Sequence, residues 1–388
     1  MHHLTINVID CKDKLEHTEL DALVNTVNVQ HKTKYLKLLT KNLDNNFKGY
    51  FIIAKQDEEI IAWTYAFIDN GFSFHGLLSG VTERLYNIFP IRFKTAFVSS
   101  PVAEYNVFHI SGKYKNQEDA IISKMMAGAM EYFKKEKVKM VVVKDHITKY
   151  PSEYLHKKFT HLHFMPGTYL DFGCIQHGCT CFDDYLMSLK KKWRSNIRNK
   201  MNRRKEDLLI EIINAASLTE DECVRCHELY FQTRGKQRLK HECLTMDYFC
   251  ACGKELGDSC KMIVAKTGGV IIGFAQLLEN EDDVINVRMG MDYACNREYN
   301  LYHHLLYENI VYCLENKKKK LYTSQTCYRP KLEMGAKFMP LHTYVYFENP
   351  LLHKLFGKIF VDHCKCYSEL IEADRPSEVL SKHNLCPY

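Results

Sequence analysis

Residues 52–63 read IIAKQDEEIIAW and residues 263–274 read IVAKTGGVIIGF, so a similar pattern returns after 211 positions. In both copies two apolar runs flank a short polar link, which is typical of a β-hairpin. A second similarity follows each copy, because residues 117–143 and 300–324 both combine an amphipathic helix, a lysine-rich end and an apolar strand. Repetition on this scale predicts two copies of one mixed α/β module.

The size and composition of the chain agree with two domains. Its 388 residues exceed one ordinary core, and 46% hydrophobic with 26% charged residues is typical of a soluble globular protein. No apolar run approaches the roughly 20 residues of a membrane helix, so we expect no membrane span. The first ten residues lack the basic start and cleavage site of a secretory signal, which favours a cytoplasmic location.

We expect the fold class to be α/β (α+β), with a mixed, mostly antiparallel sheet flanked by helices in each module. The expected divisions are a first module at 1–172, a linker at 173–181, a second module at 182–360 and a tail at 361–388. The second module is expected to open with one helix over residues 182–205 and to contain a last strand at 342–347.

The cysteines and the basic residues are unevenly distributed. Six of the 16 cysteines lie within residues 223–260, where Cys223-x-x-Cys226-His227 has metal-ligand spacing. That stretch reads as helical, so we favour buried thiols and expect no metal ligand among the candidate site residues. From Lys190 to Lys205, nine of 16 residues are Lys or Arg. Such a run attracts phosphates of CoA, tRNA or a membrane surface, or it forms a solvated helix face.

Several segments carry a resemblance to a known family. They are Phe182-Asp183-Asp184-Tyr185-Leu186, Trp193-Arg194-Ser195-Asn196-Ile197-Arg198, Leu229-Tyr230, Phe249, Gly273, and Tyr328-x-x-Lys331-x-x-x-Gly335. Across residues 182–352 they resemble the GNAT superfamily of acyltransferases, and in particular the tandem-GNAT branch of FemA/B/X-like and related acetyltransferase-like proteins. The resemblance implies acyl transfer to an amine from an acyl thioester or an aminoacyl-tRNA, with no permanently bound cofactor.

In the family that it resembles, backbone amides at a helix start bind the pyrophosphate of CoA, because unpaired N–H groups and the helix dipole converge there. The corresponding stretch here, residues 294–301, leads into a helix expected over residues 300–316 and contains Arg297 and no glycine.

Acyl transfer also requires a base, a group that stabilises the oxyanion and an acid for the leaving group. Asp292, at the end of an expected strand, is the candidate base, or else a helix cap. His303, in the first turn of the next helix, is a second candidate, or else a surface histidine. Tyr328 is the candidate proton donor to the leaving group.

Five further positions are candidates for binding. Gln325 and Lys331 lie near the carboxyl end of a buried strand, where ligands bind in open α/β sheets, although such residues also pack structurally. Arg288, inside an apolar strand, is a candidate carboxylate or phosphate anchor, or a structural ion-pair partner. Arg194 and Arg198 are the candidate donor-binding residues of the basic run.

These observations favour an N-acyltransferase that moves an acyl group from acyl-CoA or an acyl carrier protein to the amine of a small or peptide-like acceptor. One alternative is a FemX-type peptidyltransferase that uses aminoacyl-tRNA, which would explain the basic run. Another is a non-catalytic binding protein of the same fold. The absence of a DNA-binding motif, together with a net charge of only +6, disfavours a DNA-binding protein.

Overall fold

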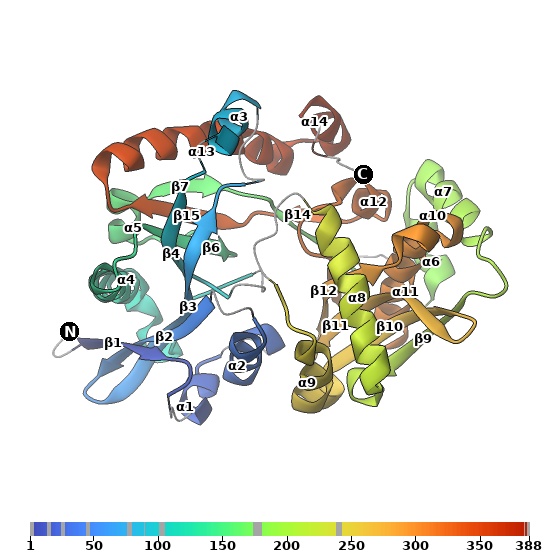
Figure 1. Cartoon of the computed structure of the whole chain (residues 1–388), viewed down its shortest axis with the longest axis horizontal. Coiled ribbons are helices and arrows are strands. Elements are labelled where there is room, and N and C mark those ends of the chain that lie inside the picture. Colours follow the sequence, from blue (N-terminus) through green and yellow to red (C-terminus); the bar gives the residue numbers. More distant parts are fainter. Residues whose placement is uncertain are drawn as a thin grey trace.

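The computed structural model describes residues 4–13, 17–24, 28–43, 47–75, 80–88, 90–100, 105–173, 181–237, 243–383 and 385. Within them it forms two mixed β-sheets that lie side by side, each flanked by helices (Figure 1). The expected fold class is therefore confirmed. Among these residues, no helix combines the length and the apolar character needed to cross a lipid bilayer.

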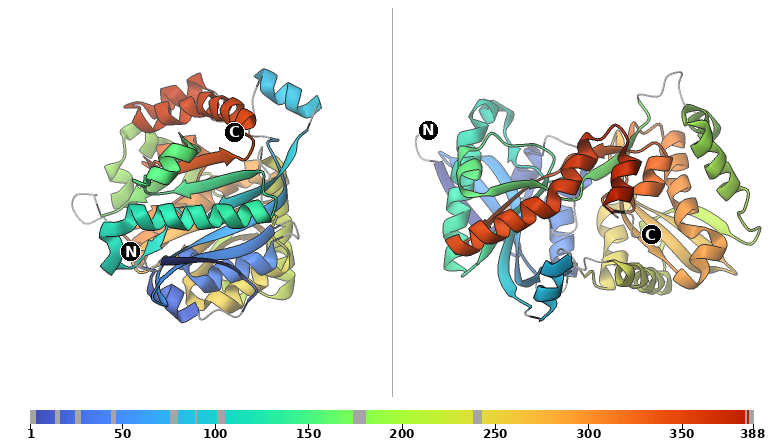
Figure 2. Two further views of the ribbon diagram at one scale, coloured as in Figure 1. Left: turned by 90° about the vertical axis from the view of Figure 1, so that its left-hand side faces the viewer. Right: turned by 90° about the horizontal axis from the view of Figure 1, so that it is seen from above.

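The first sheet has the strand order β1-β2-β3-β4-β6-β15-β7, and β5 pairs with β3. Its strands are β1 (Leu4–Asp10), β2 (Phe47–Gln56), β3 (Glu59–Ser73), β4 (Arg92–Val98), β5 (His109–Ile110), β6 (Met140–His146), β7 (Thr160–His163) and β15 (His342–Phe347). Helix α4 (Glu118–Lys135) buries an apolar stripe against one face, and α13 (Pro350–Glu372) packs on the other (Figure 2).

The second sheet has the order β14-β8-β13-β12-β11-β10-β9. Its strands are β8 (Gly167–Asp171), β9 (Leu209–Asn214), β10 (Cys260–Thr267), β11 (Val270–Glu279), β12 (Asp283–Met291), β13 (Lys320–Tyr322) and β14 (Lys337–Met339). Helix α11 (Leu301–Glu315) covers one face, and α8 (Glu220–Lys236) and α9 (Asp247–Leu256) cover the other.

The two halves share one apolar core. Helix α2 (Thr33–Asn42) of the first half packs against α9 of the second, and buried residues of both belong to the same cluster. The remaining helices are short: α1 (His17–Ala22), α3 (Gly80–Ile88), α5 (Glu153–Lys158), α6 (Phe182–Ser188), α7 (Lys191–Met201), α10 (Tyr293–Tyr299), α12 (Tyr328–Glu333) and α14 (Pro376–Lys382).

The repeated sequence pattern corresponds to two hairpins with the same register. Ala54 lies opposite Ala62 in the β2–β3 hairpin, and Ala265, 211 positions after Ala54, lies opposite Gly273 in the β10–β11 hairpin. In both hairpins the register shifts directly after this alanine. Such a shift marks a β-bulge, which bends the strand and increases its twist. The two hairpins therefore share the bulge as well as the apolar pattern.

Each half of the chain contributes one strand to the sheet of the other half. Strand β8 begins only a few residues after β7, yet it lies in the second sheet between β13 and β14. Conversely, β15 follows β14 closely and lies in the first sheet between β6 and β7. This pairing crosses the expected boundaries at residues 172 and 182 in both directions, and α13 continues past residue 360. The domain division itself stays a prediction, and most of the expected linker, residues 174–180, lies outside the described residues.

The single helix expected over residues 182–205 is divided into α6 and α7, so that prediction was wrong. The Ser188 hydroxyl donates to the Tyr185 carbonyl oxygen at 2.6 Å, and Leu189 takes an extended conformation. A serine that bonds to a nearby backbone carbonyl competes with the helix. The chain therefore turns here before the basic residues begin.

Candidate functional site

The parallel strands β12 and β13 diverge in the second sheet. Their pairing ends at Ile285 and Tyr322, although β12 continues to Met291. Directly after β13, Ser324, Thr326 and Cys327 all have positive φ angles, of 61°, 62° and 46°. This conformation costs about 1–3 kcal/mol for a residue other than glycine, and such strain is concentrated at functional sites. We call residues 323–327 the strained loop.

Hydroxyl groups hold the strained loop against neighbouring strands. Thr168 Oγ1 on β8 lies 2.9 Å from Thr323 Oγ1 and 2.6 Å from the Ser324 carbonyl oxygen, to which it donates. The Ser324 hydroxyl donates to the carbonyl oxygen of Asn286 on β12 at 2.8 Å. The loop is thus fixed at the place where β12 and β13 separate.

Three predicted site residues lie together around this loop. Gln325 Nε2 donates to Asp145 Oδ1 at 3.2 Å and to the Met165 carbonyl oxygen at 2.7 Å. The Tyr328 hydroxyl donates to the Pro166 carbonyl oxygen at 3.0 Å. All of these partners belong to the first 172 residues. Gln325 and Tyr328 therefore connect the strained loop to β6 and to the link between β7 and β8.

Lys331 on α12 is buried, with 4% of its surface exposed. Its ammonium group donates to the carbonyl oxygens of Ser324 and Gln325 at 3.1 and 2.9 Å. These bonds place the positive charge directly beneath the strained loop. Its contribution to substrate binding stays a prediction.

Arg288 is a nearly buried cation on β12, 9% exposed. Its Nη1 donates to the Val287 carbonyl oxygen at 2.5 Å. Burial raises the pKa of Tyr35 on α2 and of Tyr248 on α9, and the charge of Arg288 opposes both shifts. Arg288 therefore lies close to side chains of both halves, where a guanidinium group is suited to bind an anion.

Asp292 is the N-cap of α10. Its Oδ1 accepts a hydrogen bond from the Ala294 amide at 3.0 Å, and Oδ2 pairs with Arg225 Nη2 at 2.9 Å. The Tyr293 amide donates to Gln232 Oε1 at 3.2 Å. Side chains thus already occupy the first amides of the helix that follows β12. Arg297 is exposed on the same helix.

His303 lies in the first turn of α11, away from the strained loop in the sequence. Its Nε2 is 2.8 Å from Lys200 Nζ. Burial, with a smaller effect from the Lys200 charge, lowers the pKa of His303 to about 4. The imidazole is therefore neutral at pH 7 and accepts the hydrogen bond from the lysine.

Arg194 and Arg198 both lie on α7. Arg194 Nη1 donates to the Met187 carbonyl oxygen at 3.2 Å, and Arg198 Nη2 lies 3.6 Å from Asp183 Oδ1. Other cations of the basic run form ion pairs as well, namely Lys200 with Glu333, Arg204 with Glu308 and Lys205 with Glu298. Lys190, Lys191, Lys192 and Arg203 are exposed. The basic run is therefore partly neutralised, and its exposed charge is greatest at the start of α7.

The structure assembles only part of the predicted set. Gln325 is part of the strained loop, Tyr328 and Lys331 adjoin it, and Arg288 lies on β12. By contrast, Asp292, Arg297, His303, Arg194 and Arg198 belong to α7, α10 and α11 or their ends. Sequence reasoning missed Asp145 and Thr168, which hold the loop from the other half of the chain. Neither has a local sequence signal. The unusual positive φ of Asp145, 54°, is seen only in the structure.

Comparison with known proteins agrees with this architecture. Residues 92–373 match the FemAB-like family, described as peptidoglycan biosynthesis/recognition. A comparison with curated protein sequences finds no match.

Three solved structures share the fold over most of their length. FemX has a TM-score of 0.55 at 10% identity and covers 89% of this chain and 99% of its own. A tandem GNAT protein from the clavulanic acid biosynthesis pathway has a TM-score of 0.53 at 11% identity, covering 90% and 99%. L-PGS from Bacillus licheniformis has a TM-score of 0.52 at 8% identity, covering 88% and 96%. The family match spans most of the sequence and these structures share its architecture, so the chain belongs to the FemAB-like family and has a tandem GNAT fold.

Proposed function

We propose that this protein transfers an aminoacyl group from a charged tRNA to the amine of a peptide-like acceptor. Membership of the FemAB-like family and the tandem GNAT fold support a transferase of acyl or aminoacyl groups. The choice of donor rests on one observation, the state of the helix start that follows β12.

A CoA pyrophosphate at that helix start would need free amides and a positive potential. The Ala294 amide is instead capped by the Asp292 carboxylate, and the Tyr293 amide is bonded to Gln232. At the start of α11, which follows residues 294–300, the Tyr302 amide is bonded to Asn296 Oδ1. These amides are therefore already engaged by side chains and would have to be released before a pyrophosphate could bind them. The exposed charge at the start of α7, by contrast, suits the phosphate backbone of an RNA.

In the proposed reaction the acceptor amine attacks the ester carbonyl of the aminoacyl-tRNA. A C–N bond forms, the ester C–O bond breaks, and the amine loses a proton while the ribose oxygen gains one. We assign the strained loop to the oxyanion, because left-handed residues arrange successive amides into an anion-binding concavity. Tyr328 and Lys331 adjoin this loop. Of the two bases expected from the sequence, Asp292 is engaged as a helix cap and in the ion pair with Arg225, so His303 is the candidate base.

The test compares transfer from charged tRNA with transfer from acetyl-CoA and acyl carrier protein, using one peptide-like amine acceptor. The variant K190Q/K191Q/K192Q removes three exposed charges from the start of α7. The control K124Q/K134Q/K135Q removes three exposed charges from α4, in the first half.

We expect transfer from tRNA by the wild type, and a slope of log affinity against log salt that is smaller by about 2–3 in the α7 variant only. An equal decrease of this slope in both variants would contradict a tRNA-binding surface on α7. Transfer from a thioester alone would replace the proposal by the thioester route, for which exposed Arg297 is the candidate anchor. Inactivity with every donor would favour a binding protein.

A further inference from the structure

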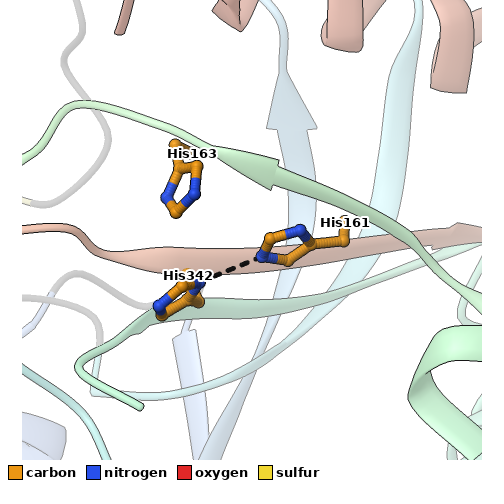
Figure 3. A group of neighbouring side chains, drawn as sticks. All are labelled: His161, His163 and His342. Carbon is orange, nitrogen blue, oxygen red and sulfur yellow. Dashed lines mark hydrogen bonds between the residues drawn. The ribbon is translucent and has the colours of Figure 1, made fainter. Parts of the chain in front are cut away.

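Three histidines gather on neighbouring strands of the first sheet (Figure 3). His161 and His163 lie two residues apart on β7, and His342 on β15 is paired with His163 in the antiparallel register. Residues two apart on a strand, and residues directly opposite across a strand pair, point to the same face of a sheet. The register alone therefore places all three imidazole rings on one face.

The rings are close enough to share one ion. His161 Nε2 lies 3.0 Å from His342 Nδ1, and one ring nitrogen from each of the three residues falls within 4.8 Å of the others. The ring centroids of His163 and His342 are 4.8 Å apart. A tetrahedral Zn²⁺ with Zn–N bonds of about 2.0–2.1 Å requires nitrogens about 3.4 Å apart. The observed separations, 3.0 Å for one pair and no more than 4.8 Å for the others, bracket that value.

The hydrogen bonds of the three histidines also leave ring nitrogens that can bind a metal. His163 Nδ1 is 3.2 Å from the Leu341 carbonyl oxygen, so Nδ1 carries the proton and Nε2 keeps its lone pair. A metal-binding histidine commonly donates its other N–H to a backbone carbonyl in this way. The bond between His161 and His342 is replaced when both bind an ion, and the donor ring moves its proton to its other nitrogen.

The histidine group is partly open to solvent. All three histidines are only partly buried, which leaves room for an ion and a fourth ligand from solvent.

We propose that His161, His163 and His342 bind a divalent transition metal of the Zn²⁺ class and that this metal ties the exchanged strand β15 to β7. Three imidazoles without a carboxylate suit Zn²⁺, Co²⁺, Ni²⁺ or Cu²⁺, whereas Mg²⁺ and Ca²⁺ require oxygen ligands. Three protein ligands also leave a fourth position for water. The site lies where the chain passes from one sheet to the other, because His163 ends β7, shortly before β8, and His342 begins β15, shortly after β14.

Among the described residues, the histidine group alone brings three potential ligand atoms together. The Cys223-x-x-Cys226-His227 sequence lies on α8, where burial raises the pKa of both thiols. Thiols remain the main competitors for a soft metal, so the experiment must distinguish nitrogen from sulfur ligands.

The experiment titrates Co²⁺ into the full-length protein after dialysis against EDTA, with visible absorption as the readout. His163→Asn removes the ligand nitrogen while its amide can still donate to Leu341. His161→Phe removes a different ligand and keeps an aromatic ring beside Tyr344, which guards against a folding defect in either variant. His75→Ala changes an exposed histidine and serves as the control.

We expect one equivalent of Co²⁺ to bind the wild type and the control with a four-coordinate nitrogen spectrum. Each ligand variant should bind more than about 100-fold more weakly, because loss of even a supporting hydrogen bond costs 10- to 100-fold. Zn²⁺ should raise the unfolding midpoint of the wild type and of neither ligand variant. Unchanged binding in both variants, or a thiolate-to-cobalt absorption band, would overturn the proposal. Metal binding is measured without turnover, so its outcome is independent of the proposed function.

Discussion

Asp292 Oδ2 lies 2.9 Å from Arg225 Nη2, and this ion pair joins the start of α10 to α8. Because Oδ1 also caps the helix, we expect Asp292→Asn to retain the cap and lose only the ion pair. The free energy of unfolding should fall by about 1 kcal/mol, since both side chains are about a quarter exposed or less. Turnover should change by less than about twofold.

Denaturant unfolding and the transfer assay measure these two effects separately. Arg225→Gln should lose at least as much stability without affecting turnover, because Arg225 also donates to the Ile271 carbonyl oxygen and to Glu228. A fall in turnover of about 100-fold or more in Asp292→Asn alone would instead identify Asp292 as the general base.

The Tyr328 hydroxyl donates to the Pro166 carbonyl oxygen and is buried. Tyr328→Phe should therefore lower the free energy of unfolding by about 1–2 kcal/mol, because a buried carbonyl loses its donor. Because this bond already holds the hydroxyl proton, turnover should fall less than about tenfold. Tyr346→Phe, at a partly exposed position, is the control for stability. A larger loss of turnover with unchanged stability would support Tyr328 as the acid.

The stability of the protein should decrease below pH 6.5 because of His31. Burial lowers the pKa of His31 from 6.5 to about 4, against the smaller effect of its hydrogen bond to the Tyr105 carbonyl oxygen. The folded-state pKa lies below the unfolded value, so the unfolded chain takes up the proton first as the pH falls. The contribution of His31 is complete above about pH 6.5 and is lost between pH 6.5 and 4, by about 1.4 kcal/mol per pH unit.

His31→Gln keeps a donor for Tyr105 and cannot titrate. Denaturant unfolding at several pH values between 5 and 7 should give a shallower dependence in this variant than in the wild type. Identical pH dependence in the two proteins would show that His31 does not contribute.

Two glycines in helices should respond oppositely to alanine. A Cβ at Gly253 on α9 would lie 2.4 Å from the backbone of Ala215, which cannot move away easily. At Gly235 on α8 a Cβ would meet nothing within 4 Å. Gly253→Ala should lower the free energy of unfolding by about 1–3 kcal/mol, and Gly235→Ala should raise it by about 0.5–1 kcal/mol. Denaturant unfolding of the two variants checks both signs.

The hairpins could be predicted from the sequence because their apolar pattern is local. Ala54 and Ala265 each lie opposite a residue only eight positions away, so the turn and the alternation determine the pairing. The exchanged strands could not be predicted in this way. Strands β7 and β8 are separated by only three residues, and nothing local in the sequence indicates that they join different sheets.

The candidate site was predicted only in part for the same reason. The sequence indicated Gln325, Tyr328 and Lys331 because they follow a buried strand, where ligands commonly bind. The partners of Gln325 and Tyr328 are Asp145, Met165 and Pro166, about 160–180 positions away in the chain, and only the folded arrangement brings them together. Asp292 shows the opposite case, since the cap that it forms was one of the two readings of its position.

The strand exchange has a consequence for synthesis on the ribosome. The gap between β6 and β7 is closed only by β15, which begins at His342, long after His163 has been made. At about 5–20 residues per second, the nascent chain waits roughly 10–40 s with that position in the first sheet unfilled. Exposed strand edges are prone to wrong pairing, so this interval is when a chaperone would matter most. The first half therefore reaches its final form only after most of the second half has been translated.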